Sequence, residues 1–281
     1  MTAPMVIFRT STPAVLTDAA FGPLPATWPL PPASTGEDAW LRAVALGGAG
    51  RYAAAHAELD ALVAPGGRTG RLASLAQSTR ASLVRQLGWH AQARGLDGRA
   101  LAVAGTDAEA RSDALIGLAA DALGLARFPL AHALLEQAEA LSAPGGVRWP
   151  WRLPLRLAWV HAELAMVSGD GPRSLRYART AEQLAADVPS VRHQVKTAMV
   201  LAAALSSAGD FDESAAVAAR GLQAATTNGL VPLRWALAAM LAGLPSFEGA
   251  RHSLEELVAV RRECAAGIVR AGGRWRLEVV D

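Results

Sequence analysis

Three histidines lie one helical turn from carboxylates, a spacing that lets two side chains bind one metal ion from the same helix face. These sets are His56 with Asp60, His132 with Glu136, and His252 with Glu255 and Glu256. The same spacing is typical of solvated pairs on helix surfaces, and no third ligand lies nearby in the sequence. The sequence therefore predicts no metal site and no cofactor.

The glycines at the start of the chain do not predict a nucleotide site. Residues 48–53, Gly-Ala-Gly-Arg-Tyr-Ala, match the letters of a dinucleotide fingerprint, but that motif follows a strand, and residues 37–46 have a helical pattern. Lys196 follows Val195 rather than a glycine-rich segment, which excludes a phosphate-binding P-loop. No Ser/His/Asp arrangement stands out. We expect no catalytic residues and a non-enzymatic protein.

The C-terminal region is rich in arginine but is not strongly basic overall. Its arginines are Arg261, Arg262, Arg270, Arg274 and Arg276, with Trp275 among them and Glu255, Glu256 and Glu263 close by. The glutamates offset much of the positive charge, and the net charge of the whole chain is only +2. This balance favours a solvated face over nucleic-acid binding. Lys196 is the only lysine, and the preference for arginine is typical of a GC-rich genome and predicts a bacterial source.

The elements that position these residues are predicted to be helix hairpins, because one kind of turn recurs along the chain. The turn residues are Gly50, Gly88, Ala126, Gly169, Gly209 and Pro245, which are 38, 38, 43, 40 and 36 residues apart. These steps match two-helix repeat units. The composition is 52% hydrophobic, mostly Ala and Leu, which favours close-packed helices. We therefore predict an all-α fold of about six antiparallel hairpins.

Helical periodicity and breaker residues place twelve helices between these turns. The predicted helices span 37–48, 52–63, 71–87, 90–104, 107–124, 128–142, 151–168, 172–187, 190–207, 211–227, 231–243 and 247–271. Residues 1–35 are proline-rich, and we expect them to form an arm without a helix that docks on the repeats. A disordered tail is the alternative. Residues 36–273 are predicted to form the repeat domain, and residues 274–281 a tail.

Small residues precede several turns, as Ala162 and Ala165 precede Gly169, and an aromatic residue often follows the turn, as Phe211 follows Gly209. With these features the chain resembles the tetratricopeptide repeat (TPR) family over residues 37–271. The resemblance implies a right-handed superhelical solenoid whose concave groove binds a peptide or helix of a partner protein. The family's groove positions fall on Trp40, Arg85, Arg156, Trp159, Glu163, Met166, Lys196, Met199 and Trp235.

The resemblance does not identify a ligand, and two further functions stay open. One is a sensor or regulatory module of a transcriptional or signalling system, and the other is a helical protein that binds a small ligand. Cys264 is the only cysteine, which excludes internal disulfides, and no apolar stretch reaches the ~18 residues of a membrane span. These features predict a cytoplasmic location without membrane contact. The oligomeric state is not predicted.

Overall fold

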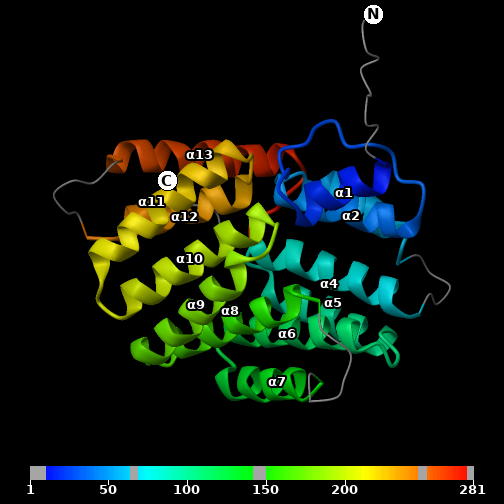
Figure 1. The fold of residues 1–281 in the computed structure, drawn as a ribbon, viewed down its shortest axis with the longest axis horizontal. Coiled ribbons are helices and arrows are strands. Elements are labelled where there is room, and N and C mark those ends of the chain that lie inside the picture. Colours follow the sequence, from blue (N-terminus) through cyan, green and yellow to red (C-terminus); the bar gives the residue numbers. More distant parts are fainter. Residues whose placement is uncertain (1–10, 64–68, 142–149, 246–251, 277–281) are drawn as a thin grey trace, which may run out of the picture.

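The computed structural model describes residues 11–63, 69–141, 150–245 and 252–276, and within these ranges the chain forms helices and no strand (Figure 1). The helices are α1 (Thr12–Phe21), α2 (Gly36–Gly48), α3 (Tyr52–Asp60), α4 (Arg71–Gln86), α5 (His90–Val103), α6 (Ala108–Gly124), α7 (Phe128–Ala140), α8 (Arg152–Val167), α9 (Gly171–Ala186), α10 (Val191–Ser207), α11 (Phe211–Thr227), α12 (Val231–Gly243) and α13 (Leu254–Arg270). The all-α prediction is confirmed. None of these helices has the length and apolar composition that a membrane span requires.

Consecutive helices pair into hairpins, from α2 with α3 to α12 with α13, and each hairpin packs on the next. The even-numbered helices α2 to α12 also contact one another in order along the chain, whereas the odd-numbered helices α3 to α13 contact mainly their hairpin partners and flanking even-numbered helices. We call α2, α4, α6, α8, α10 and α12 the inner helices. They form one continuous layer, so side chains on successive inner helices meet across the repeats.

The hairpin turns fall where the sequence placed them. Gly50, Gly88, Gly169 and Gly209 all have positive φ, between 73° and 89°, which is the left-handed conformation that ends many helices. Ala126 takes the same place in the third hairpin with φ of 56° and is the one described non-glycine residue with positive φ. A Cβ atom disfavours this conformation. The third turn is therefore strained where the others are not.

One helix was not predicted, and one predicted helix boundary is wrong. Residues 1–35 were expected to lack a helix, yet α1 occupies Thr12–Phe21. Pro13 is in the first turn of α1, where its missing N–H would have no helical partner, and Leu16, Ala19 and Ala20 are buried. The last helix was expected from residue 247 but begins at Leu254, where Ser253 and Glu256 form a capping box. The sixth predicted turn lies mostly in residues 246–251, outside the described ranges.

The row of hairpins curves until its end meets its beginning (Figure 1). The backbone N–H of Ala53 donates to the carbonyl of Ala271 over 2.8 Å, and the N–H of Arg276 donates to that of Leu87 over 3.0 Å. Ile268 of α13 is fully buried within the same apolar core as α1, α2 and α3. The first and last hairpins therefore share one core, and the inner helices surround a common interior.

We predict that Ala126→Gly stabilises the protein by about 0.5–1 kcal/mol, because it removes the left-handed strain at an exposed turn. Chemical denaturation of the variant beside the parent protein measures the change in the free energy of unfolding.

Gly209→Ala is the matched control. A Cβ atom at residue 209 would meet no other atom within 4 Å, so only backbone strain acts there, and we expect a loss of about 1 kcal/mol. If both substitutions changed stability in the same direction, the left-handed strain at residue 126 would not be the cause.

Candidate functional site

The candidate site is the set of charged and aromatic side chains on the inner helices. Four residues, Arg71, Glu109, Arg152 and Arg192, occupy the same position in successive repeats, each 17 residues before the turn residue of its hairpin. Glu109 bridges its two neighbours, with its carboxylate oxygens 2.6 Å from Arg71 Nε and 2.8 Å from Arg152 Nη2. We call these four residues the arginine ladder.

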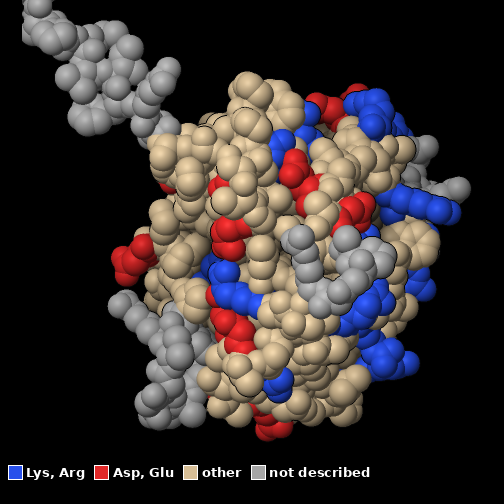
Figure 2. Space-filling view, turned by 90° about the vertical axis from the view of Figure 1, so that its right-hand side faces the viewer, with Lys and Arg blue, Asp and Glu red and all other residues tan. Residues whose placement is uncertain are grey.

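Acidic and basic side chains alternate along the first part of the ladder. Arg71 also approaches the carboxylate of Glu37 on α2, at 3.4 Å, so acidic and basic side chains follow one another from α2 to α8. Figure 2 shows such neighbouring red and blue side chains along one face of the molecule. The alternation ends at α10, where Arg192 follows Arg152 without a carboxylate between them.

A second buried cluster joins α4, α5 and α6. Arg85 of α4 pairs with Asp97 of α5 and with Asp121 of α6, whose Oδ1 lies 2.7 Å from Arg85 Nε. Asp97 lies against Gly117, where a Cβ atom would overlap its carboxylate. Asp97 is fully buried, and its pairing with Arg85 supplies the partner that a buried carboxylate requires.

Two carboxylates share one guanidinium in this cluster, and one oxygen of each carboxylate is buried without a hydrogen bond. Burial raises the pKa of Asp97 to about 7, against the opposing effect of Arg85, and the neighbouring Asp121 raises it further. Burial also raises the pKa of Asp121. The pair therefore retains a proton near neutral pH that neither carboxyl group would hold in the unfolded chain.

An aromatic cluster lies beside the ladder, where α1 meets the inner helices. The ring of Phe21, at the end of α1, lies 5.3 Å from Trp40, 6.4 Å from Trp151 and 5.9 Å from His193, measured between centroids. The guanidinium carbons of Arg152 and Arg192 lie 5.0 and 5.7 Å from the Phe21 centroid. Phe21 thus joins the N-terminal helix to the ladder, and the expected docking of the N-terminal segment is seen from residue 11 onward.

The imidazole of His193 also lies against the ring of Phe21. Its Nδ1 lies 2.8 Å from the hydroxyl oxygen of Ser190. Burial lowers the pKa of His193 well below its usual value, and the positive charges of Arg192, Arg152 and Arg156 lower it further. His193 is therefore neutral at physiological pH and adds no charge to the ladder.

The nine groove residues expected from the family resemblance lie on inner helices, but most are engaged within the protein. Trp40 and Trp159 are buried, and their indole N–H groups donate to Thr79 and Thr197 on the next inner helix, each over 3.0 Å. Met166 and Met199 pack on the core of the later hairpins, and Trp235 lies on Trp275, with centroids 4.6 Å apart.

The charged members of the expected groove are paired. Arg85 is held in the cluster described above, and Arg156 pairs with Asp113 of α6. Lys196 Nζ lies 3.1 Å from the carboxylate of Glu163. The structure therefore uses Arg156 and Lys196, which were expected to face a ligand, to neutralise acidic side chains of the protein itself.

Sequence reasoning missed Arg152, Arg192 and His193. The signal that finds the first two is the shared repeat position of the ladder, which becomes visible once the turn residues are aligned. Among the residues that the structure describes, no three His, Cys, Asp or Glu side chains are close enough to bind one metal ion. His132 and Glu136 form an exposed surface pair at 3.4 Å.

No family model, curated protein or solved structure matches the chain. The geometry of the inner helices is therefore the basis for the function proposed below.

The shared proton of Asp97 and Asp121 predicts a pH-dependent stability. Because the native pKa of Asp97 is about 7 and the unfolded value is near 4, the folded state binds more protons between these values. The free energy of unfolding that this group contributes should then fall as pH rises from about 4 to about 7, by at most about 1.4 kcal/mol per pH unit.

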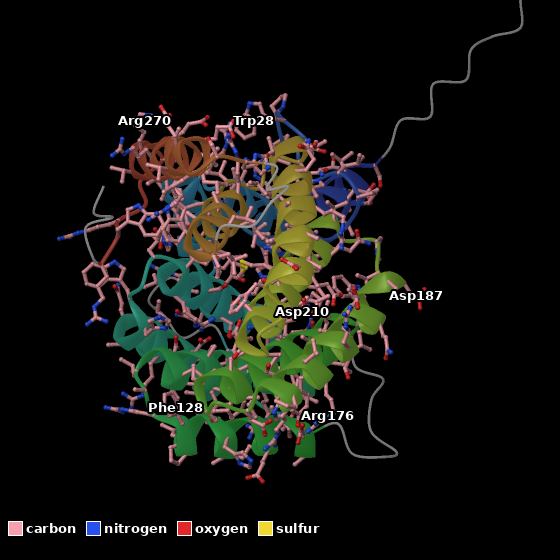
Figure 3. The ribbon with its side chains drawn as sticks, turned by 90° about the vertical axis from the view of Figure 1, so that its left-hand side faces the viewer. Trp28, Phe128, Arg176, Asp187, Asp210 and Arg270 are labelled. Atoms are coloured by element: carbon pink, nitrogen blue, oxygen red, sulfur yellow. The ribbon has the colours of Figure 1, made fainter. Side chains whose placement is uncertain are left out.

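The test compares the parent protein with Asp97→Asn across this pH range by urea denaturation. The variant should gain stability relative to the parent as pH rises. Asp187→Asn is the control, since this exposed carboxylate projects from the edge of the molecule (Figure 3). A stability difference between Asp97→Asn and the parent that stays constant from pH 4 to 7 would contradict the shared proton.

Proposed function

We propose that this protein is a non-enzymatic interaction module that binds a helix of a partner protein against its inner helices. In this proposal the hairpins form a right-handed solenoid of the tetratricopeptide type. Support comes from the regular spacing of the turns and from the ordered contacts between successive hairpins. A cytoplasmic location is part of the proposal, since the single cysteine, Cys264, is buried and unpaired.

The observation that carries this proposal is the docking of α1. This helix precedes the repeats in the chain, yet Phe21 at its end lies against Trp40 of α2, Trp151 at the start of α8 and His193 of α10. The aromatic side chains thus receive a helix that is not part of a hairpin. A partner helix with an aromatic residue at the corresponding place would make the same contacts and would compete with α1.

The chemistry of the contact suggests what such a partner presents. Aromatic anchors in partly apolar surroundings often dominate the binding energy of protein interfaces. Arg152 and Arg192 flank Phe21, so the surroundings also favour an electron-rich ring or an acidic residue beside the anchor. Since Arg156 and Lys196 have internal partners, we assign selectivity to the aromatic cluster and the end of the ladder.

A peptide supplied in trans tests whether the inner helices accept a helix. The probe is a labelled peptide of residues 11–33, and the receptor is the protein without residues 1–33. We expect the receptor to bind this peptide, and we expect the peptide variant Phe21→Ala to bind at least about tenfold more weakly, because it lacks the buried anchor. Fluorescence anisotropy measures both affinities.

Two controls accompany this titration. Circular dichroism establishes that the truncated receptor keeps its helices. The full chain should bind the peptide weakly because its own α1 occupies the surface, and Phe21→Ala in the full chain should restore binding. A folded receptor that does not bind the peptide would overturn the proposal.

A further inference from the structure

The end of the arginine ladder carries a charge that the protein does not neutralise. Arg192 lies in the first turn of α10, and its side chain crosses to α2, where Cδ would lie 3.1 Å from a Cβ atom placed on Gly48. Its Nε is buried and has no hydrogen-bond partner. Within the described ranges, no carboxylate pairs with Arg192. Its guanidinium carbon lies 5.7 Å from the centroid of the Phe21 ring.

The carboxylates near Arg192 are already paired with other arginines. Arg152 is neutralised by Glu109, and Arg156 by Asp113. Burial lowers the pKa of Arg192 to about 10, and the positive charges of Arg152 and Arg156 contribute to this. Arg192 is still charged at neutral pH. Arg192 is half-buried, and a partly desolvated cation without a counterion destabilises the fold. An anion beside Arg192 would therefore be stabilised.

The ladder shows what kind of group belongs there. At the preceding step, the carboxylate of Glu109 lies between Arg71 and Arg152 and accepts hydrogen bonds from both guanidinium groups. The next step has two arginines, Arg152 and Arg192, and no carboxylate. A guanidinium presents its N–H groups in a planar fork that matches carboxylate and phosphate oxygens. An external oxyanion would occupy the position that an acidic side chain fills one repeat earlier.

We propose that Arg192 anchors a binding site for the oxyanion of a small organic ligand, a carboxylate or a phosphate group, at the junction of α1, α2 and α10. The rings of Phe21, Trp40 and Trp151 lie beside this position and would contact an aromatic or apolar body of the same ligand. This inference rests on the unpaired charge and does not depend on the binding of a partner helix.

Inorganic phosphate is the first probe, with the full chain in chloride buffers of constant ionic strength. We expect the melting temperature of the parent protein to rise with phosphate in a saturable manner, as ligand binding to the folded state requires. Arg192→Met keeps a long unbranched side chain without the charge. In chloride alone this variant should melt at a higher temperature than the parent, because it no longer holds an unpaired cation in a half-buried position.

The decisive result is the response of Arg192→Met to phosphate. The proposal expects the saturable rise to disappear in this variant and to persist in Arg176→Gln, which removes an exposed arginine from the outer helix α9 at the periphery of the molecule (Figure 3). An equal rise in the parent and in Arg192→Met would show a general salt effect and would overturn the site. The absence of any saturable rise in the parent would also overturn it.

Calorimetric titration with benzoate and with phenyl phosphate then distinguishes the two oxyanions. The ligand that binds the parent at least tenfold more tightly than Arg192→Met identifies the group that the site takes. If neither ligand distinguishes the two proteins, the site is rejected. The α1 peptide titration remains a separate measurement, so the failure of one proposal does not affect the other.

Discussion

Charge buried away from water must be paired, and this constraint organises the inner helices. The cost of burying an ion without a partner amounts to several kcal/mol, and the inner helices carry arginines at positions where successive repeats meet. Glu109 pairs with Arg71 and Arg152 at once, Asp113 pairs with Arg156, and the Asp97–Asp121 pair holds Arg85. Arg192 is the exception. The pairs join neighbouring hairpins, so the same contacts that neutralise the charges also fix how each repeat sits on the next.

The curvature of the hairpin row brings its last hairpin against its first. Because α13 returns to the first hairpins and Ile268 shares their core, side chains of later hairpins reach the first one, as Arg192 and Leu230 reach Gly48. The N-terminal helix also packs on the inner helices through Phe21. The contacts that a partner helix would need are thus present in the unliganded chain and are already made by α1, which explains how exposed aromatic surface is avoided without a partner.

The sequence predicted the repeats well because local rules determine them. A residue in the left-handed conformation commonly ends a helix. All five predicted turns within the described ranges fall at such residues, four of them glycines and the fifth Ala126. Helix α1 was missed because its stability comes from burial of Leu16, Ala19 and Ala20 rather than from propensity. Proline counts alone also cannot distinguish Pro13, which is favourable in a first turn, from prolines that prevent a helix.

The site was harder to predict because pairing across repeats depends on register between residues about forty positions apart. Arg156 and Lys196 were correctly placed on inner helices, but their partners Asp113 and Glu163 could not be inferred without the geometry. Alignment of the repeats supplies the missing register. Once repeats are aligned on their turns, one column contains Arg71, Glu109, Arg152 and Arg192, and the break in its alternation marks the residue without a partner.

Arg192, the residue at this break, also contacts parts of the chain that are distant in sequence. Arg192 packs on the backbone of Gly48 in the first hairpin and lies over Phe21 of α1, while it belongs to α10 of a later hairpin. The charge of Arg192 therefore lies where α1, α2 and α10 meet. An anion beside Arg192 would stabilise the approach of all three, because it would replace the repulsion among Arg152, Arg156 and Arg192 with attraction. Ligand binding at this point would then tighten the contact between α1 and the inner helices, since an interaction that stabilises a shared junction stabilises each element that forms it.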